Sequence, residues 1–262
     1  MNKKLSFLSL NIGNPSIERA KKQCEWLLKR KEDVFILTET KNSKGCMYIE
    51  EFFLQFGYDL FTMNSSLNFD VSFPKSQTGD LGVMIISKYK ILKESNYFSK
   101  NDVFYSRQLE ISISIKDYVI DLVGLYVPSR DRSEKKIERK EKFINEFEKY
   151  MINSKKETKV IMGDLNILEK NHNPHYSTFF NWEYNFYDEI LNNEFIDAYK
   201  FCHPDKNEYS WVGRTNNGYR YDYCFISSDL KDKLIDCYYI HDTRKNGLTD
   251  HSAIVLSLEM NV

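Results

Sequence analysis

The stretch Ile161-Met162-Gly163-Asp164-Leu165-Asn166 decides the fold. Its apolar start indicates a buried β-strand over Lys159–Met162, and the turn formers that follow mark the end of that strand. The charged segment Ser133–Met151 comes before it, with apolar residues at helical spacing at Ile137, Phe143, Ile144, Phe147 and Met151. We therefore predict an outer helix, then a buried strand that ends in a carboxylate and an amide.

Upstream of this stretch, apolar runs and turn formers alternate in the same way. Leu5–Leu10 is expected to be a buried strand, 16–30 a helix, and Val34–Leu37 a second strand. A helix around Met47–Gln55 follows, and the polar stretch Asn64–Asp80 is expected to be a long surface loop. Four consecutive strands of a mainly antiparallel sheet are then predicted at Leu81–Ser87, Ile91–Tyr97, Arg107–Ile115 and Val119–Val127.

Downstream, the pattern of strands with an outer helix repeats. Residues 183–196 are expected to be helical, and strands are predicted at Tyr209–Val212, Tyr221–Ile226, Ile235–His241 and Ala253–Leu258. Neither a linker nor a low-complexity stretch divides the chain. We therefore expect residues 1–262 to form a single α/β domain with two β-rich halves.

The composition is that of a packed globular protein. Hydrophobic residues make up 42% of the chain and aromatic residues 15%, and the formal net charge is −1. This balance predicts no global attraction to nucleic acid, so a polyanionic substrate would need a local basic surface or a bound cation. Five cysteines, an odd number without a C-x-x-C pair, predict reduced thiols.

Membrane association is not expected. The apolar run Leu5–Leu10 is too short for a signal peptide, and no stretch approaches the roughly 18 apolar residues of a membrane span. The expected location is the cytoplasm, and a monomer is the favoured state.

Acidic and amide residues stand at the ends of several predicted strands: Asn11, Glu39, Asp164, Asn166, Asp222, and Asp250 beside His251. Any one of them alone is more often an ordinary turn residue. Together, at the strand ends where sites collect in α/β proteins, they would form an oxygen-rich pocket. Carboxylate, amide and water are the ligands that Mg²⁺ and Mn²⁺ prefer.

The motifs that contain these residues occur in one order along the chain. They are Leu8-Ser9-Leu10-Asn11, Leu37-Thr38-Glu39-Thr40-Lys41, Gly124-Leu125-Tyr126-Val127-Pro128, Ile161-Met162-Gly163-Asp164-Leu165-Asn166, Tyr219-Arg220-Tyr221-Asp222-Tyr223 and Thr249-Asp250-His251. This order resembles the endonuclease/exonuclease/phosphatase superfamily across essentially the whole chain. The resemblance implies a four-layer α/β sandwich, with two mixed β-sheets face to face and helices outside.

Within the superfamily the chain looks most like exonuclease III and the abasic-site endonucleases. Tyr126 stands where the pancreatic-DNase and inositol-phosphatase branches typically have histidine. The run from Ile196 through Trp211 to Tyr223 is similar to the segment before the penultimate catalytic aspartate of the exonuclease III branch. Arg107 looks like a backbone-phosphate contact. The implied activity is magnesium-dependent hydrolysis of DNA, at abasic sites or at 3′ ends.

The resemblance also implies a role for each matching residue of the chemistry. Glu39 would bind the metal, with Asn11 beside it, and Asp250 would complete the metal site. Asp164 would activate the attacking water and Asn166 would hold a phosphate oxygen. His251, polarised by Asp222, would contact the scissile phosphate, and Tyr126 would help to stabilise the developing charge.

Four residues are expected to contact the DNA: Arg107, Arg130, Trp211 and Arg220. Arg130 begins a basic run that is equally consistent with a solvated helix face, because glutamates alternate with its cations. One motif departs from the family pattern. Gly13 stands two positions after Asn11, where relatives often have a polar residue, which puts a second metal contact in doubt and favours a single metal.

Three other functions stay open. Asp250-His251-Ser252-Ala253-Ile254 is similar to the retroelement branch, so the chain could be a DNA-nicking endonuclease of that type or a nuclease used against foreign DNA. A small-phosphodiester phosphatase is disfavoured by Tyr126. A catalytically silent binding module has only Gly13 in its support.

Overall fold

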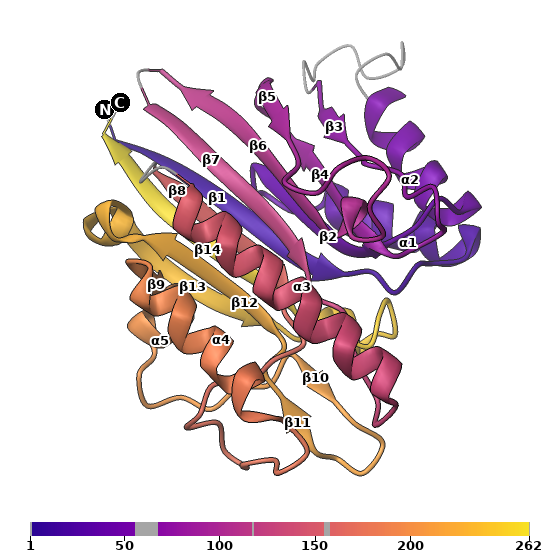
Figure 1. Ribbon diagram of the computed structural model, residues 1–262. Helices are drawn as coiled ribbons and strands as arrows, with labels where there is room; N and C mark the ends of the chain where they lie inside the picture. Colours follow the sequence, from indigo (N-terminus) through magenta and orange to yellow (C-terminus); the bar gives the residue numbers. More distant parts are fainter. Residues whose placement is uncertain (1, 56–67, 117, 155–157, 262) are drawn as a thin grey trace.

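The computed structural model describes residues 2–55, 68–116, 118–154 and 158–261. Its strands form two mixed six-stranded sheets (Figure 1). The first has the order β13 (Leu234–Ile240), β14 (Ala253–Asn261), β1 (Asn2–Asn11), β2 (Val34–Thr40), β4 (Gly82–Ser87) and β3 (Asp70–Ser72). The second has the order β5 (Ile91–Ser95), β6 (Gln108–Ile115), β7 (Tyr118–Tyr126), β8 (Lys159–Asp164), β12 (Asp222–Ser227) and β9 (Phe195–Asp197).

The two sheets pack face to face around one apolar core. Inward-facing residues such as Phe7, Ile36, Ile111 and Leu122 are fully buried there. Each sheet contains one parallel pair, β1 with β2 and β7 with β8, among antiparallel neighbours. Both faces of the central strands are buried, because helices cover the outer side of each sheet.

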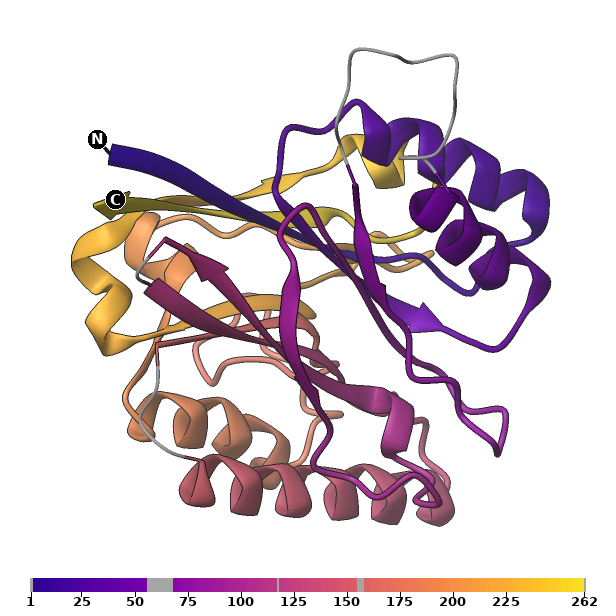
Figure 2. The same ribbon diagram turned by 90° about the horizontal axis from the view of Figure 1, so that it is seen from above.

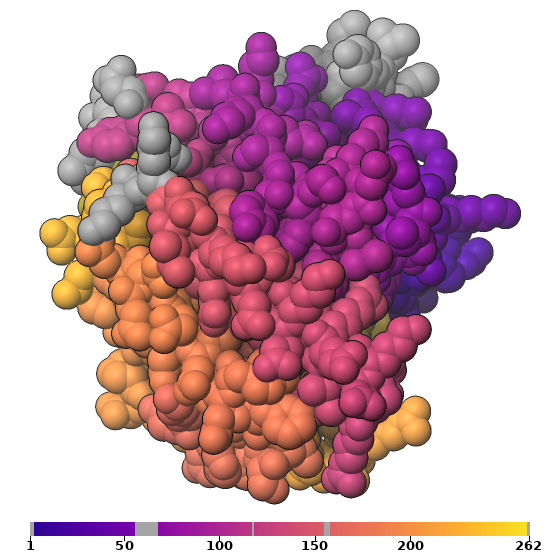
Figure 3. Space-filling model, in the orientation of Figure 1, coloured from indigo at the N-terminus to yellow at the C-terminus, as the bar shows by residue number. Residues whose placement is uncertain are grey.

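Helices form the two outer layers (Figure 2). On the first sheet lie α1 (Ile17–Leu28), which Ser16 caps through a hydrogen bond from the Arg19 amide, and α2 (Lys44–Gln55). On the second lie α3 (Glu134–Asn153) and α4 (Asn181–Asn192), the pink and orange part of the face seen in Figure 3. The predicted four-layer sandwich is confirmed.

Short elements complete the described chain. They are the helices α5 (Ala198–Cys202) and α6 (Asp242–Lys245), the 3₁₀ turns Tyr105–Arg107 and Ser228–Lys233, and a hairpin of β10 (Trp211–Val212) and β11 (Gly218–Tyr219). All five cysteines are free. Across the described residues, no helix combines the length and the apolar character that crossing a membrane requires.

Two sequence expectations need correction. The four strands expected in one sheet between residues 81 and 127 are divided, because β4 pairs with β2 in the first sheet while β5, β6 and β7 begin the second. The expected loop Asn64–Asp80 contains a strand, β3, which extends the edge of the first sheet beside β4. The beginning of that stretch, through residue 67, lies outside the described residues.

Gly163 allows β7 and β8 to approach closely at the end where polar residues gather. Its φ is +152°, and a Cβ there would lie 1.9 Å from the carbonyl oxygen of Leu125. Only glycine fits such an approach. The pairing that results sets Tyr126 directly opposite Asp164.

Candidate active site

The ends of the central strands of both sheets deliver the polar residues to one place. Asp164, the last residue of β8, pairs with Tyr126 of β7 on one side and with Asp222 of β12 on the other. Asn11 and Thr38 pair at the ends of β1 and β2 in the facing sheet, and Glu39 follows. Each of these strands is an apolar run that ends in a polar residue. The polar side chains therefore gather in a ring at one edge of the sandwich.

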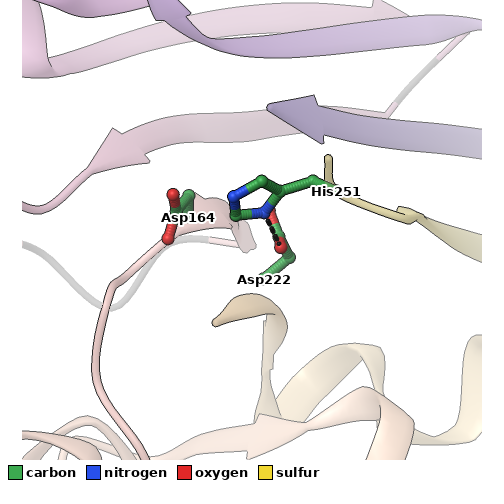
Figure 4. Close-up of side chains that lie close together, drawn as sticks. All are labelled: Asp164, Asp222 and His251. Atoms are coloured by element: carbon green, nitrogen blue, oxygen red, sulfur yellow. Dashed lines mark hydrogen bonds and ion pairs between the residues drawn. The ribbon is translucent and has the colours of Figure 1, made fainter. Parts of the chain in front are cut away.

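Asp164, Asp222 and His251 form the centre of this ring (Figure 4). One side-chain atom from each lies within 4.8 Å of the other two. His251 Nδ1 is 2.7 Å from Asp222 Oδ2, and Asp222 is fully buried. The imidazole therefore has a fixed orientation, with a carboxylate behind it.

Backbone and hydroxyl groups hold Asp222 in place. The hydroxyl oxygen of Ser210 accepts hydrogen bonds from the amides of Tyr221 and Asp222, each at 3.0 Å. The phenol of Tyr239 donates to the carbonyl of Asp222 at 2.6 Å. Neither Ser210 nor Tyr239 was expected from the sequence to support the site.

Asp164 is buried among charges of both signs. Asn11 Nδ2 donates to its Oδ2 at 2.9 Å, and the amide of Asn166 donates to its Oδ1 at 3.0 Å. Burial, with the neighbouring carboxylates of Asp222 and Glu39, raises the pKa of Asp164 to about 8, while the charge of His251 opposes that rise. A carboxylate that exchanges its proton near neutral pH suits general-base chemistry.

His251 has the opposite electrostatic setting. Burial works to lower its pKa, but the adjacent carboxylate of Asp222 outweighs burial and raises the pKa to about 10. The ring therefore carries a positive charge at neutral pH. Because Nδ1 faces Asp222, the Nε2–H is the group left to donate to an anionic ligand.

Glu39 and Tyr126 face each other across the two sheets. Glu39 has φ +55° at an irregularity in the β2–β4 pairing, so it leaves the strand register. The phenol of Tyr126 donates to Glu39 Oε1 at 3.1 Å. Burial, and then the negative charge of Glu39, raise the pKa of Tyr126, which keeps its proton as a hydrogen-bond donor.

Asp250 and Trp211 are joined by a hydrogen bond. Trp211 Nε1 donates to Asp250 Oδ2 at 2.9 Å. Burial acts to raise the pKa of Asp250, but this donor and the charge of His251 prevail and lower it. Asp250 is therefore a carboxylate at neutral pH.

A cavity of about 370 Å³ opens beside these residues. Acidic and basic groups both line it: Glu39, Asp164, Asp250 and His251 lie with Asn166, Arg130, Asp131, Arg132 and Lys140. The rest of the wall consists of Ser129, Thr178, Phe179, Trp211, Tyr219 and Tyr221. Eight of the twelve residues predicted for the site therefore belong to this cavity. Seven of them line its wall, and the eighth, Asp222, lies behind His251.

Lys140 and Glu183 support the cavity; the sequence reasoning counted Lys140 in the basic run that Arg130 begins, as a phosphate contact or a solvated residue, and gave Glu183 no role. The Lys140 ammonium, 1% exposed, donates to Glu183 Oε1 at 2.6 Å and to the carbonyl of Asn166 at 2.5 Å. Asn166 has φ +50°, and its side-chain amide donates to the carbonyl of Val127 at 3.1 Å. The signal was present, since Lys140 stands three residues after Ile137, within the apolar stripe of α3.

Two arginines expected to contact DNA do not reach the cavity. Arg220 is 1% exposed and pairs with Asp197 at 2.7 Å and with Glu169 at 3.2 Å. Successive side chains of an extended backbone point to opposite sides. Tyr219 and Tyr221 face the cavity, so Arg220 between them points the other way, into the protein. Arg107 is 4% exposed, lies 4.7 Å from the ring centre of Tyr126, and pairs with Asp80 at 2.8 Å. Both arginines lie outside the cavity lining and form ion pairs with carboxylates of the protein.

Arg130 and Asn11 also differ in part from their expected roles. Arg130 lines the cavity, but its guanidinium pairs with Glu183 and donates to the carbonyl of Thr178 at 2.7 Å. Asn11 was expected beside a metal, yet it is fully buried, and its Oδ1 accepts from the amide of Gly13 at 2.9 Å. Both ends of the Asn11 amide are engaged by the protein, and its nitrogen end is bonded to Asp164.

Oxygen donors of the kind that a divalent cation prefers line the cavity. Glu39 and Asp250 both present carboxylates to the cavity, and hard oxygen ligands are those that Mg²⁺ and Mn²⁺ prefer. Asp222 Oδ1 is buried and has no hydrogen-bond partner among the described residues, which adds to the negative potential there.

Comparison with protein-family models identifies the group to which this architecture belongs. The model of the endonuclease/exonuclease/phosphatase family matches residues 8–251. The chain belongs to that family. Membership places this endonuclease/exonuclease/phosphatase protein among enzymes that hydrolyse phosphoric esters, as the sequence predicted. A comparison with curated proteins found no significant match.

Solved structures share the fold of this family member over nearly its full length. An AP endonuclease from Archaeoglobus fulgidus has a TM-score of 0.80 at 22% identity, covering 98% of this chain and 100% of its own. The 3′ phosphatase NExo from Neisseria, bound to a product DNA hairpin, has a TM-score of 0.74 at 16% identity, covering 98% and 100%. AP endonuclease LMAP from Leishmania major has a TM-score of 0.71 at 16% identity, covering 98% and 88%.

Proposed function

We propose that the protein is a divalent-metal-dependent phosphodiesterase that cleaves DNA beside abasic sites or at 3′ ends. The observation that carries this proposal is the meeting of Asp164, the Asp222–His251 pair, Glu39 and Asp250 at one cavity. The similar folds described as AP endonucleases and as a 3′ phosphatase bound to DNA support the choice of substrate.

Hydrolysis of a phosphodiester needs an activated water and stabilisation of extra negative charge. Asp164 takes the proton from water, because it is a buried carboxylate whose pKa lies near neutrality. His251 donates from its outer ring nitrogen to a phosphate oxygen, and Asp222 keeps it charged. The phenol of Tyr126 donates its one proton to Glu39 Oε1 and so orients that carboxylate.

Glu39 and Asp250 are the residues that would hold Mg²⁺, with Mn²⁺ as a substitute. A bound cation supplies Lewis-acid stabilisation of the phosphoryl oxygens. It also offsets a strongly negative centre in a chain whose formal net charge is −1. We expect a single metal, because Gly13 brings no side-chain ligand to the strand end where Asn11 is already engaged.

A substrate panel tests this function. Purified protein is incubated with duplexes that carry an abasic site, a nick, a 3′-phosphate or no lesion, in Mg²⁺ and in EDTA. We expect cleavage or 3′ processing of at least one lesion-bearing duplex in Mg²⁺ only. Folded protein that leaves every duplex intact in Mg²⁺ and in Mn²⁺ would contradict the proposal.

Nicking of intact DNA is the second candidate. It is favoured by the Asp250-to-Ile254 motif and by the near-neutral charge, which does not provide a general grip on DNA. Supercoiled plasmid, added to the same panel, separates the two. Conversion of plasmid to the open circle at a rate above that on the abasic duplex would favour the nicking enzyme.

A further inference from the structure

A second cavity, of about 460 Å³, lies on the outer face of the first sheet. Residues of β1, β14 and β13 form its floor, and the segment between α1 and β2 forms its wall. In Figure 1 the ends of β1 and β14 that carry it lie beside the two chain termini. Ser6 in the floor and Asn11 at the active-site end of β1 are roughly 17 Å apart, at about 3.3 Å per residue of strand. The cavity is therefore separate from the proposed catalytic centre.

Positive charge dominates the wall of this cavity. Four cationic side chains line it against two carboxylates, and the formal net charge of the whole chain is only −1. The cations are Lys4, Lys29, Arg30 and Lys31, and the carboxylates are those of Glu32 and Asp33. We call this space the lysine cavity.

Protein groups already engage both carboxylates. Arg30 Nε and Nη2 donate to the two oxygens of Glu32 at 3.0 and 2.6 Å. Asp33 Oδ2 accepts hydrogen bonds from the amide and the hydroxyl of Ser6 at 2.8 and 3.0 Å. The three lysines, by contrast, form no ion pair within the described part of the chain. Their ammonium groups are the charges left for a ligand.

The end of α1 does not cancel these charges. The C-terminal end of a helix carries a negative charge of about half an elementary unit, which offsets part of one ammonium group. The amides of Lys29 and Arg30 also donate to the carbonyls of Trp26 and Leu27, at 3.2 and 3.0 Å. The wall therefore stays positive where the helix ends.

Ser257 brings an unpaired hydroxyl to the floor. It lies opposite Ser6 in the β1–β14 register. Its neighbours Leu256 and Leu258 face the core between the sheets, so the Ser257 side chain is on the outer face, where the cavity lies. Ser257 is 1% exposed, and its Oγ has no hydrogen-bond partner among the described residues. Because buried hydroxyls in folded proteins are almost always paired, this one indicates a partner that the chain itself does not supply.

We propose that the lysine cavity binds the phosphate group of a small ligand. Three ammonium groups provide the positive charge that a phosphate dianion requires, and the Ser257 hydroxyl is free to donate to one of its oxygens. The volume exceeds that of a phosphate ion and lies within the roughly 300–1,000 Å³ of ligand pockets. Tyr238 lines the remaining space with an aromatic ring. This inference goes beyond the proposed function and does not depend on it.

Titrations followed by the amide resonances of isotope-labelled protein test the site. Orthophosphate and dAMP are added separately in EDTA, and KCl at matched ionic strength is the reference. We expect both phosphates to shift the amides of residues 29–33, Ser6 and Ser257, while the amides of Asp164 and Asn166 stay in place. A tighter Kd for dAMP would identify a nucleotide as the ligand, whereas equal values would show that the phosphate group alone is recognised.

Three variants and a matched control separate a built site from general charge. Lys29→Ala and Lys31→Ala should each weaken the Kd for orthophosphate about fivefold, the equivalent of about 1 kcal/mol. Lys22→Ala removes the same charge from an exposed position of α1 outside the cavity, and we expect it to leave the Kd unchanged. Ser257→Ala should weaken binding without destabilising the free protein, because no hydrogen bond is lost.

Amide shifts that KCl reproduces in full would overturn the proposal. Equal weakening of binding by Lys22→Ala and Lys31→Ala would overturn it too, because the phosphate would then respond only to the overall charge. The wild-type titration decides by itself if a variant fails to fold. Failure of this site would leave the proposed function untouched, since the substrate panel tests that function separately.

Discussion

Replacement of Asp164 by asparagine tests both the chemistry and the electrostatics of the centre. Asparagine has the same shape and can still accept the hydrogen bond from Asn11, but it cannot take a proton from water. A positioned general base contributes roughly 10² to 10⁴-fold in rate. We expect kcat on the preferred duplex in Mg²⁺ to fall by about that factor.

The same variant should alter how stability depends on pH. The folded-state pKa of Asp164, about 8, lies above its ordinary value of 3.8, so the folded state holds a proton that the unfolded state releases. Stability is therefore lost as pH rises from about 4 to about 8. Between pH 5 and pH 8 this loss amounts to about 4 kcal/mol, at about 1.4 kcal/mol per pH unit.

Asparagine does not titrate, so Asp164→Asn should escape this loss. Urea unfolding in EDTA at pH 5 and at pH 8 measures it, and EDTA is needed because a bound cation would favour the carboxylate. At pH 5 the variant should be about 1 kcal/mol less stable than wild type, because the side-chain nitrogen of asparagine cannot accept the hydrogen bond from the Asn166 amide, which is lost. At pH 8 it should be the more stable protein. An unchanged kcat would refute the assigned role, and parallel stability curves would refute the raised pKa.

Three further outcomes are expected. Lys140→Met should lower the free energy of unfolding by about 3 to 5 kcal/mol, because it breaks a buried ion pair, and thermal melting checks this. Gly163→Ala should prevent folding, which circular dichroism checks, because the added Cβ would lie 1.9 Å from the carbonyl oxygen of Leu125. In the control Gly247→Ala the added Cβ meets nothing within 4 Å, so stability should fall by only about 1 kcal/mol, for the positive φ. The alkaline limb of kcat/KM should lie near pH 10, where His251 loses its charge, and Asp222→Asn should move it to lower pH; a limb that stays in place would contradict the pairing.

Much of the fold could be predicted because its strands are short apolar runs that end in polar residues. The strand–helix–strand opening, the long α3 and the C-terminal strands follow from periodicity alone. Sheet membership did not, since every residue of β4 and β8 is buried and neither strand shows the alternation that distinguishes two faces. The single-domain organisation, the monomeric state and the cytoplasmic location stay predictions.

The site was predictable to the extent that a residue type reveals its task. Acidic and amide residues that recur at the ends of several strands indicate a shared site, although each alone is more often a turn residue, and Asp164, Asp222 and His251 do meet. Arginine is ambiguous, because the same guanidinium that binds phosphate also satisfies buried carboxylates, as Arg107 and Arg220 do. The alternation of side chains from 219 to 221 would have separated the inward arginine from the tyrosines on either side.

The pairing of the first and last long strands has a consequence for how the protein is made. β1 is antiparallel to β14 from Asn2 opposite Asn261 to Ser9 opposite Ile254, and Thr249 donates to the carbonyl of Asn11 at 2.7 Å. Chains grow on the ribosome at about 5–20 residues per second, so β14 is synthesised many seconds after β1. Asp250 and His251 arrive with it. The centre is therefore incomplete throughout synthesis of the preceding chain, and a fragment released early lacks the histidine and one of the two carboxylates proposed to hold the cation.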